Sequence, residues 1–374
     1  MNILIFSWRG PGHPNAGGAE ISTHEHAKGW VKAGHSVTLF TAAFVRGIEY
    51  EVIDGVNIIR RGRQIFGVQW EAFKWYLFDK HIKFDLVIDQ FHGLPFFTPL
   101  YIKHNKLGFI HEVTKDVWRV NPWPFPLNLV PAILGPLVEP YFFKLYKNVP
   151  FMTVSQSTKK DLCEWGIKSN NITVVHNGVT IYKLKKIPAK EKKNTFIYLG
   201  ALSQDKGIES ALKVFSIISN TEDNWQFWVV GKCDPKYLRK LKALCNNLRL
   251  DKNIKFWGFV NEKKKFELLS RAHLAINPSV REGWGLVNIE ANFFGLPVLA
   301  YDVAGSRDSI RMGINGFLSP LGDYQDMASK ALKLMNDKDL YNKMQSKSKT
   351  WSRNFTWKKS VKESLKLIED LVKV

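Results

Sequence analysis

The chain has 374 residues, of which 45% are hydrophobic, and this is enough for two ordinary hydrophobic cores. Its formal net charge of +20 calls for an anionic partner, such as a nucleotide phosphate, an acidic lipid or nucleic acid. No RNP, zinc-finger or helix-turn-helix pattern is visible, so we expect no nucleic-acid binding. The three cysteines show no Cys-x-x-Cys or Cys/His spacing, which argues against a zinc site or a disulfide framework and favours a reducing compartment.

Strand-like runs alternate with segments of helical length along the first half of the chain. The opening run at 2–6 is a strand pattern rather than a signal peptide, because it is short and no basic segment precedes it, so we expect a cytoplasmic protein. The later runs lie at 35–40, 56–61, 85–89, 108–112, 151–155 and 172–177. This alternation predicts a parallel, doubly wound α/β sheet, with a functional site at the carboxyl ends of its strands.

Basic and aromatic residues are interleaved between positions 60 and 83. Helical spacing places Trp70, Phe73 and Leu77 on one face, which fits packing in a core. The remaining rings and the arginines within 60–63 are harder to bury. Together with the 13 tryptophans and the charge of +20, they predict an element that faces an anionic membrane surface.

Residues 120–138 form a run of 19 residues without a charge. Five prolines and two asparagines within it would break a helix and leave backbone groups unsatisfied in lipid, so we expect no transmembrane helix. Two interpretations stay open for this run. It is either an interfacial or acceptor-binding segment, or an apolar loop packed on its own domain.

A lysine-rich segment separates the two halves of the chain. Residues 183–194 hold six lysines and one proline with little apolar content, which predicts a linker. Strand-like runs at 226–231, 253–260 and 273–278 then predict a second parallel sheet. We therefore expect four parts, namely a first domain at 1–182, a linker at 183–193, a second domain at 194–355 and a terminal helix at 356–374.

The most informative segment runs from 277 to 310 and contains two carboxylates, Glu282 and Glu290, on either side of a glycine turn. Gly283 and Gly285 permit a positive φ or a close backbone approach in that turn. A helix is predicted from Leu286, with an apolar stripe of Leu286, Ile289, Phe293 and Phe294 and with Gly295 as its stop. A helix N-terminus behind a glycine turn suits a phosphate, whereas the same residues taken alone also fit an ordinary loop and an exposed helix face.

The register of this segment resembles the E-x7-E signature of the retaining glycosyltransferases of family 4, which have the GT-B fold. The matching positions are Pro278, Ser279, Glu282, Gly283, Gly285, Glu290, Ala291, Gly295, Pro297 and Gly305. The resemblance implies two Rossmann-like α/β domains that face a cleft, the first for the acceptor and the second for a nucleoside diphosphate sugar. It extends over nearly the whole chain, including a final helix from about Trp357 that would cross back onto the first domain.

The resemblance also assigns roles to the two glutamates, a lysine and a histidine. It implies that Glu290 holds the ribose, Glu282 the donor sugar or the diphosphate, and Lys206 the diphosphate. His111 corresponds to the histidine that lines the donor-sugar pocket from the other domain, so closure of the cleft would complete the site. We expect His111, Glu282 and Lys206 to be the catalytic residues.

Donor-binding positions follow from the same resemblance. They are Gly17 and Gly18 in a GGxE region, Gly200 in the turn after a strand, Val260 near the nucleotide base, and the turn residues Gly283 and Gly285 with Leu286 and Glu290. One position departs from the family, because Ala201 stands where many members have arginine. Either Arg9, Arg281 or a larger share of helix N-terminal charge would then hold the phosphate.

The implied reaction is transfer of a sugar with retention, in which the departing phosphate helps to deprotonate the acceptor. We expect no cofactor and no divalent metal, and we interpret the isolated pair Asp337 and Asp339 as part of a solvated turn. The expected partners are a nucleotide sugar, a lipid-linked or saccharide acceptor and the anionic inner face of the cell membrane. Two other functions remain open, namely a catalytically silent GT-B subunit and a nucleoside-diphosphate-sugar epimerase. The nucleotide, UDP, GDP or ADP, is also left open.

Overall fold

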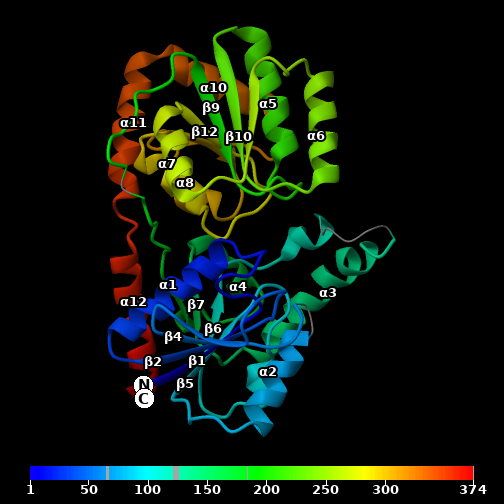
Figure 1. Ribbon diagram of the computed structural model, residues 1–374, viewed down its shortest axis with the longest axis vertical. Coiled ribbons are helices and arrows are strands. Elements are labelled where there is room, and N and C mark those ends of the chain that lie inside the picture. Colours follow the sequence, from blue (N-terminus) through cyan, green and yellow to red (C-terminus); the bar gives the residue numbers. More distant parts are fainter. Residues whose placement is uncertain (65–66, 121–125, 183, 374) are drawn as a thin grey trace. The chain divides into compact units, whose positions relative to one another are not determined.

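The protein is represented by a computed structural model that describes residues 1–64, 67–120, 126–182 and 184–373. The chain forms two compact units, and Figure 1 shows both coloured along the sequence. The first unit consists of Met1–Gly178 and Thr356–Val374, and the second of Val179–Phe355. The segment predicted as a linker, 183–193, therefore belongs to the second unit.

The first unit contains an eight-stranded sheet in the order β3-β4-β2-β1-β5-β6-β7-β8. All neighbouring strands are parallel except β3, which runs antiparallel to β4. The strands are β1 (Asn2–Ser7), β2 (Ser36–Thr41), β3 (Tyr50–Ile53), β4 (Val56–Arg60), β5 (Leu86–Gln90), β6 (Asn105–Ile110), β7 (Phe151–Thr153) and β8 (Ile172–Val174). Strand β3 was not predicted from the sequence. It forms because Asp54 and Gly55, both with positive φ, make the tight turn that pairs it with β4.

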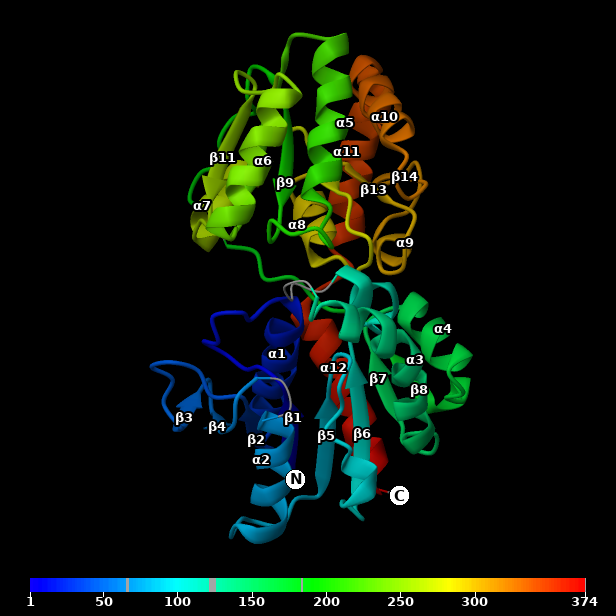
Figure 2. The same ribbon diagram turned by 90° about the vertical axis from the view of Figure 1, so that its right-hand side faces the viewer.

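Helices cover both faces of this first sheet (Figure 2). They are α1 (Gly18–Lys32), α2 (Gly67–Phe78), α3 (Leu129–Leu145), α4 (Gln156–Glu164) and α12 (Trp357–Lys373), with short 3-10 helices η1 (Thr98–Leu100), η2 (Lys115–Val120) and η3 (Ser169–Asn171). The last helix packs on α1, where Ser364 Oγ lies 2.8 Å from His26 Nδ1 and accepts a hydrogen bond from Trp30 Nε1 at 3.0 Å. The chain therefore ends in the unit in which it begins.

The structure corrects two details of the predictions for residues 60–83. The buried face of α2 carries Val68, Ala72 and Trp75, whereas Trp70 is 59% exposed and Leu77 is also exposed. The pattern misleads because the apolar residues of α2 are distributed around most of the helix, so the spacing alone does not select the inward face. Arg60 is only 3% exposed, and its guanidinium donates to the carbonyls of Ile48 and Pro11 and to Glu51. Arg60 is thus a structural residue and not part of a membrane-facing cluster.

The apolar run 120–138 also differs from expectation. Residues 121–125 lie outside the described residues, but from Leu129 the chain is helical and contains Pro136 and Pro140 inside α3. A proline inside a helix removes one N–H donor and crowds the carbonyl four residues earlier, yet α3 continues through both prolines to Leu145. Within the part of the chain that the structure describes, no helix is both long and apolar enough to cross a membrane.

The second unit contains a six-stranded sheet that is parallel throughout, in the order β11-β10-β9-β12-β13-β14. Its strands are β9 (Asn194–Leu199), β10 (Trp225–Val230), β11 (Ile254–Gly258), β12 (Leu274–Asn277), β13 (Val298–Tyr301) and β14 (Gly316–Ser319). Its helices are α5 (Ile208–Thr221), α6 (Pro235–Asn247), α7 (Glu262–Arg271), α8 (Leu286–Phe293), α9 (Ser306–Ser309), α10 (Tyr324–Asn336) and α11 (Lys338–Ser352). This order is that of the dinucleotide-binding α/β fold, with its reversal between β9 and β12.

Separate cores lie on the two faces of this second sheet. Phe196 and Tyr198 of β9 pack in one cluster, and Ile197 between them packs in the other. Successive side chains of a strand point to opposite faces, so β9 is buried on both sides. The two doubly wound α/β domains expected from the sequence are therefore confirmed.

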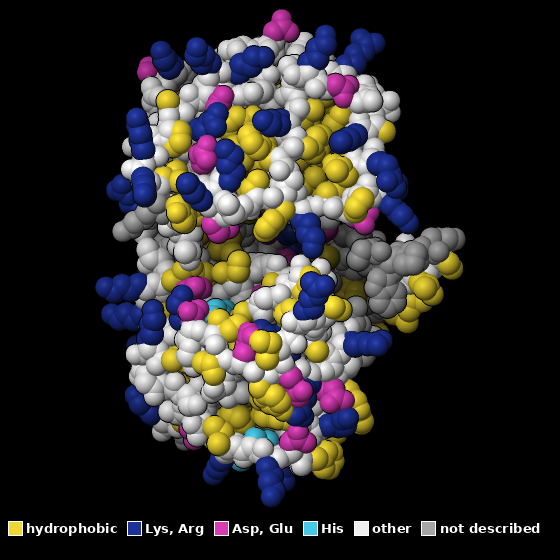
Figure 3. All heavy atoms as spheres, viewed as in Figure 1, with side chains coloured by type: hydrophobic (Ala, Val, Ile, Leu, Met, Phe, Trp, Pro, Cys, Tyr) yellow, Lys and Arg dark blue, Asp and Glu magenta, His cyan; other side chains and the backbone are white. Residues whose placement is uncertain are grey.

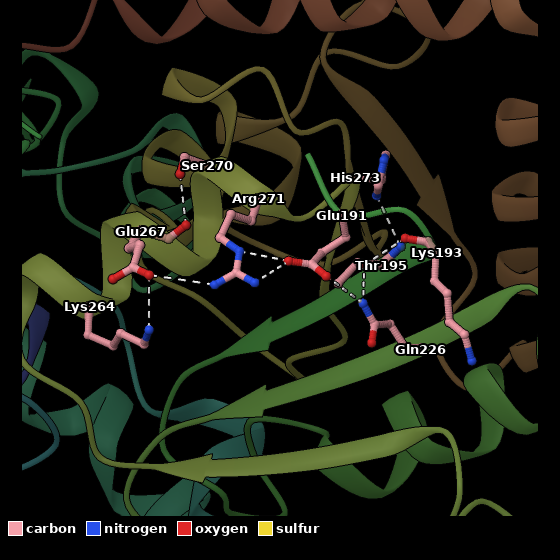
Figure 4. Close-up of polar contacts among 9 residues, drawn as sticks. All are labelled: Glu191, Lys193, Thr195, Gln226, Lys264, Glu267, Ser270, Arg271 and His273. Atoms are coloured by element: carbon pink, nitrogen blue, oxygen red, sulfur yellow. Dashed lines mark hydrogen bonds and ion pairs between the residues drawn. The ribbon is translucent and has the colours of Figure 1, made fainter. Parts of the chain in front are cut away.

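The predicted linker is attached to this unit by a polar cluster (Figure 4). Arg271 Nε donates to Glu191 Oε1 at 2.7 Å, and the Glu191 N–H donates to the Arg271 carbonyl at 3.0 Å. Gln226 Nε2 donates to Thr195 Oγ1 at 2.8 Å, and the N–H of Thr195 donates to His273 Nδ1 at 3.1 Å. Glu191, the one acidic residue of this lysine-rich segment, therefore holds the segment against α7.

Candidate active site

Two loops meet at the point where the strand order of the second sheet reverses. The loop after β9 ends at Gly207, and the loop after β12 begins at Pro278. Gly207 has φ of 70°, and a Cβ atom on it would lie 1.9 Å from the Pro278 carbonyl oxygen. The Val280 N–H donates to the Asp205 carbonyl at 2.9 Å. Only glycine fits at 207, and its small size lets the two loops pack directly together.

This contact brings Lys206 and Glu282 together although 76 residues separate them in sequence. Lys206 Nζ lies 3.0 Å from Glu282 Oε1, and the same oxygen lies 2.7 Å from Ser279 Oγ. The lysine side chain is 32% exposed and the glutamate 16%, so the pair is open to solvent on one side. It offers a cation for a phosphate group at the carboxyl edge of the sheet, held in place by a carboxylate.

The turn before α8 is supported by buried amides. Asn277 Nδ2 donates to Asn288 Oδ1 at 2.9 Å, and Asn288 Nδ2 donates to Ser309 Oγ at 2.9 Å. Gly285 has φ of 74° and is the N-cap of α8. The helix runs from Leu286 to Phe293, so it begins at the predicted residue and ends two residues before the predicted stop at Gly295. The Asn288 N–H in the first turn donates to the Gly285 carbonyl at 2.9 Å, and the positive end of the helix dipole at this N-terminus suits an anion.

The inward face of α8 differs partly from the predicted stripe. Ile289 is fully buried and Phe294 packs in the core, but Phe293 is 39% exposed. The polar residues Asn288 and Asn292 take the inward positions instead. Asn292 Nδ2 donates to the carbonyls of Leu296 and Asn315, which explains why an amide is buried there.

Glu290 lies on the same helix and is paired with Lys265 of α7, with Oε1 at 2.9 Å from Nζ. Burial raises the pKa of Glu290, and Lys265 opposes that shift. The pKa of Lys265 is raised, because Glu290 and Glu262 outweigh the opposing effect of burial. The sequence did not reveal Lys265, since it has no motif of its own and lies 25 residues before Glu290.

Glycine turns end three adjacent strands of this sheet. Gly200, Gly231 and Gly258 all have positive φ, and a Cβ atom on Gly231 would lie 1.7 Å from the Gly200 carbonyl oxygen. Val260 follows the third of these turns and is half-buried. The positions expected to approach the donor, Gly200 and Val260, therefore lie at the carboxyl ends of β9 and β11, on either side of β10.

Ala201, which stands where many family members have arginine, is exposed. Of the two arginines suggested to bind the phosphate in its place, Arg9 and Arg281, the second is buried. Arg281 is only 9% exposed, which limits its access to a ligand.

Gly283, unlike Gly285, does not have a positive φ. Gly285 is therefore the glycine of this turn whose backbone conformation other residues rarely adopt.

In the first unit, the loop after β1 is held by Glu20. The Gly17 N–H donates to Glu20 Oε2 at 2.6 Å, and Arg9 Nε donates to Glu20 Oε1 at 2.9 Å. The Arg9 guanidinium also lies 4.0 Å above the Trp8 ring. Gly17 is the N-cap of α1 and Gly18 its first residue, so the GGxE region forms a capped helix start at the carboxyl end of β1.

His111 lies directly after β6 and is 8% exposed. Its carbonyl accepts a hydrogen bond from Thr158 Oγ1 at 3.0 Å, and its Nε2 has no hydrogen-bond partner among the described residues. Burial lowers its pKa to about 3, with smaller contributions from His26 and His92. His111 is therefore a neutral imidazole at neutral pH.

Among the described residues, no group of three or more His, Cys, Asp or Glu side chains could hold a metal ion. The Asp337 side chain caps α11 by accepting from the Leu340 N–H at 2.9 Å, and Asp339 lies in the first turn of that helix. This pair thus has a structural role at a helix start.

Family models match both halves of the chain. The model for Glycosyltransferase Family 4 matches residues 16–182, and the model for Glycosyl transferases group 1 matches residues 182–351. An uncharacterized glycosyltransferase of Haemophilus influenzae is 24% identical over 354 residues, which is 93% of this chain and 95% of that protein. The O-antigen chain mannosyltransferase RfbU of Salmonella typhimurium is 27% identical over 202 residues, 54% of this chain and 55% of that protein.

Solved structures with the same fold cover the full length. Sucrose-phosphate synthase from Thermosynechococcus elongatus has a TM-score of 0.81 at 19% identity and covers 99% of this chain and 98% of its own. HepE of Anabaena, solved in complex with UDP-glucose, has a TM-score of 0.71 at 18% identity and covers both chains completely, at 100% each. At these identities the likeness shows the fold, which agrees with the strand orders described above.

Proposed function

Since the chain belongs to the family 4, group 1 glycosyltransferases of the GT-B fold, we propose that its donor is a nucleoside diphosphate sugar and that it transfers the sugar with retention. The observation that carries this proposal is the Lys206–Glu282 pair at the strand reversal of the second sheet, beside the start of α8. A cation and a helix N-terminus at one place suit a diphosphate. The likeness to HepE, which was solved with UDP-glucose, also supports this donor class.

The proposed chemistry requires no nucleophilic side chain. The bond between the anomeric carbon and the diphosphate oxygen breaks, and the diphosphate leaves with one more negative charge. An acceptor hydroxyl forms the new bond on the same face, and its proton passes to a departing phosphate oxygen. Lys206 and the first amides of α8 stabilise the charge that develops on the diphosphate, which lowers the barrier.

Glu282 has two functions in this proposal. Its Oε1 holds Lys206 and Ser279, which keeps the ammonium in place before the donor arrives. Its carboxylate also accepts hydroxyl hydrogen bonds from the donor sugar. Glu290, one turn into α8, accepts the ribose hydroxyls, and His111 contributes to binding of the donor sugar.

The proposed acceptor is a glycan carried on a lipid, at the inner face of the cell membrane. A relative from Salmonella typhimurium is an O-antigen chain mannosyltransferase, which supports a cell-surface polysaccharide as the product class. The surplus of basic residues supports an anionic surface as the place of reaction. The rival functions are a silent subunit, which Ala201 favours, and an epimerase, which would release free sugar without an acceptor.

Donor screening followed by two substitutions tests the proposal. A matching UDP-, GDP- or ADP-sugar at a hundredfold its dissociation constant stabilises the protein by roughly 2.7 kcal/mol, which thermal unfolding detects. Lys206→Met and Glu282→Gln should then lower kcat by about 10²- to 10³-fold, as for loss of one stabilising donor in a closed site. Lys236→Met on α6 is the control and should transfer sugar normally. Donor binding without turnover would favour the silent subunit, and wild-type rates in both variants would refute the assigned roles.

We also predict that sugar transfer needs no added divalent metal, because Lys206 and the α8 N-terminus neutralise the diphosphate. Activity measured in EDTA should equal activity in untreated buffer. Loss of transfer in EDTA that manganese or magnesium restores would contradict this prediction.

A further inference from the structure

Helix α3 exposes a continuous apolar stripe. Ile133, Leu134, Leu137 and Tyr141 are between 53% and 62% exposed, and Val130 precedes them at the same helical spacing. From 130 to 141 this stripe extends about 17 Å along the helix. A monomeric soluble protein rarely leaves such a surface uncovered, so the stripe indicates an interaction site.

The opposite side of α3 is firmly attached to its unit. Glu139 is buried, and its carboxylate accepts hydrogen bonds from the N–H groups of Thr114 and Lys115 and from Trp118 Nε1. A Cβ atom on Gly135 would lie 2.3 Å from the Trp118 ring, so the indole packs directly on the helix backbone. These contacts fix the rotation of α3 and hold its apolar stripe outward.

Two neighbouring elements extend this surface. Trp70, Leu77 and Phe78 of α2 and Leu100 of η1 are exposed. The elements are joined by ring contacts, with Tyr101 5.1 Å from Phe73 of α2 and Phe97 5.5 Å from Phe142 of α3. We call this area, formed by Trp70, Leu77, Phe78, Leu100 and the α3 stripe, the α2–η1–α3 surface. Figure 3 shows hydrophobic side chains on the lobe at the right-hand edge of this unit, where Figure 1 places α3.

A single buried carboxylate helps to hold these elements together. Asp89, at the end of β5, accepts a hydrogen bond from Thr98 Oγ1 of η1 at 2.8 Å and from the hydroxyl of Tyr146, just after α3, at 2.5 Å. Asp89 therefore gives η1 and the end of α3 a shared internal anchor, and the Tyr101–Phe73 ring contact joins α2 to η1.

The charges around the apolar area are basic. Exposed lysines of the same segments are Lys80, Lys83, Lys103, Lys144 and Lys147. The carboxylates of these segments are engaged, since Glu71 pairs with Lys74, Asp79 pairs with Arg61, and Glu139 is buried. Lysines beside an exposed apolar helix can reach anionic headgroups while the apolar side chains enter the lipid.

We propose that the α2–η1–α3 surface docks the enzyme on an anionic bilayer. A lipid surface fits better than a protein partner, because the five side chains of the α3 stripe offer a single hydroxyl, on Tyr141, for the hydrogen bonds that a protein interface carries. The docking proposal rests on the proposed function in one respect, because access to a lipid-linked acceptor is the reason for the enzyme to bind the membrane. It replaces the arginines at 60–63 as the docking element, since Arg60 is buried and paired.

Vesicle flotation tests the proposal with the full chain. Wild-type protein should float with phosphatidylglycerol vesicles but not with phosphatidylcholine vesicles. Leu134→Ser/Leu137→Ser/Tyr141→Ser should lower partitioning at least roughly tenfold, because three apolar side chains no longer enter the lipid. The matched control Val45→Ser/Ile187→Ser/Leu321→Ser removes equally exposed apolar side chains elsewhere and should bind within about twofold of wild type.

The charged part of the surface has its own test. Lys144→Ser/Lys147→Ser should weaken binding at low salt and flatten its salt dependence. Equal flotation of wild type and the α3 triple variant would overturn the proposal. So would a wild-type dimer that the triple variant converts to a monomer, since the surface would then serve self-association.

Failure of docking is separable from failure of the proposed reaction. Nucleotide-sugar binding, followed by thermal unfolding, depends on the second unit and should be unchanged in the α3 triple variant. A protein that floats normally but binds no nucleotide sugar would refute the proposed function and leave the docking surface standing.

Discussion

Glu290 combines a buried carboxylate with a cationic neighbour, and this arrangement sets its expected behaviour. Glu290→Ala should raise the donor dissociation constant by an amount equivalent to about 2–4 kcal/mol, because it removes a charged acceptor of two ribose hydroxyl bonds. Calorimetric titration with the donor measures this change. The control is Glu262→Ala, which removes the exposed partner of the same Lys265 and should leave the affinity near wild type. Equal losses in both variants would assign the effect to Lys265 rather than to Glu290.

His111 makes the first unit sensitive to acid. The pKa of its imidazole is about 3 in the folded protein, against an ordinary value of 6.5, so the unfolded state binds more protons between these values. This contribution to stability is complete above pH 6.5 and is lost as the pH falls toward 3. Each such group adds a slope of about 1.4 kcal/mol per pH unit.

His111→Gln should therefore lower the slope of the unfolding free energy against pH between about 4 and 6. The expected decrease corresponds to about one proton fewer taken up on unfolding. His26, also with a pKa of about 3, keeps part of that dependence in the variant. Denaturant unfolding at several pH values gives the slopes. His104→Gln, at an exposed histidine, should leave the slope as in wild type. An unchanged slope in His111→Gln would show that this imidazole is already protonated or exposed.

At the scale of elements, the site depends on two loops that touch at a glycine. Gly207→Ala places a Cβ atom against the Pro278 carbonyl and forces alanine to φ of 70°, so the loops must separate. We expect a loss of stability above about 2 kcal/mol, because left-handed strain alone costs roughly 1–2 kcal/mol for alanine. Donor affinity should fall with it, since Lys206 moves away from Glu282.

The matched control for this substitution is Gly322→Ala. Gly322 has φ of 82° with no atom within 4 Å of the added Cβ, so it reports the backbone strain without the clash. Thermal unfolding and donor titration of both variants separate the effect of backbone strain from the effect of the clash with Pro278. If Gly322→Ala and Gly207→Ala behave alike, the loop contact does not position the site.

At the scale of the whole molecule, the chain closes its first unit with its last helix. Trp30 and Ser364 are 334 residues apart, yet the indole N–H donates to the serine hydroxyl in a buried contact. Ser364→Ala should destabilise the first unit by about 1–3 kcal/mol, because it leaves the buried indole N–H without an acceptor. Hydrogen exchange of β1 and β2 measures the effect in this unit. Ser346→Ala, at an exposed serine of α11, is the control, and an equal effect there would contradict the assignment.

Much of the architecture could be predicted from the sequence, because its signals are local. Gly285 and Gly295 bracket α8, whose start at Leu286 was predicted to the residue, and the alternating runs predicted both parallel sheets. The register of ten positions from Pro278 to Gly305, with Glu282 and Glu290 among them, was sufficient to recognise the glycosyltransferase family. These features depend on backbone conformation and short-range pattern, which neighbouring residues determine.

Only the tertiary structure decided which side chains meet and which remain exposed. Lys265 as the partner of Glu290 and the burial of Arg60 depend on contacts that a linear pattern does not encode. The outward stripe of α3 depends on Glu139, whose partners lie 24 and 25 residues earlier in the chain. The stretch of α3 before Glu139 is apolar around the helix and does not select a face by itself, so hydrogen bonds to distant residues decide which face is exposed to solvent.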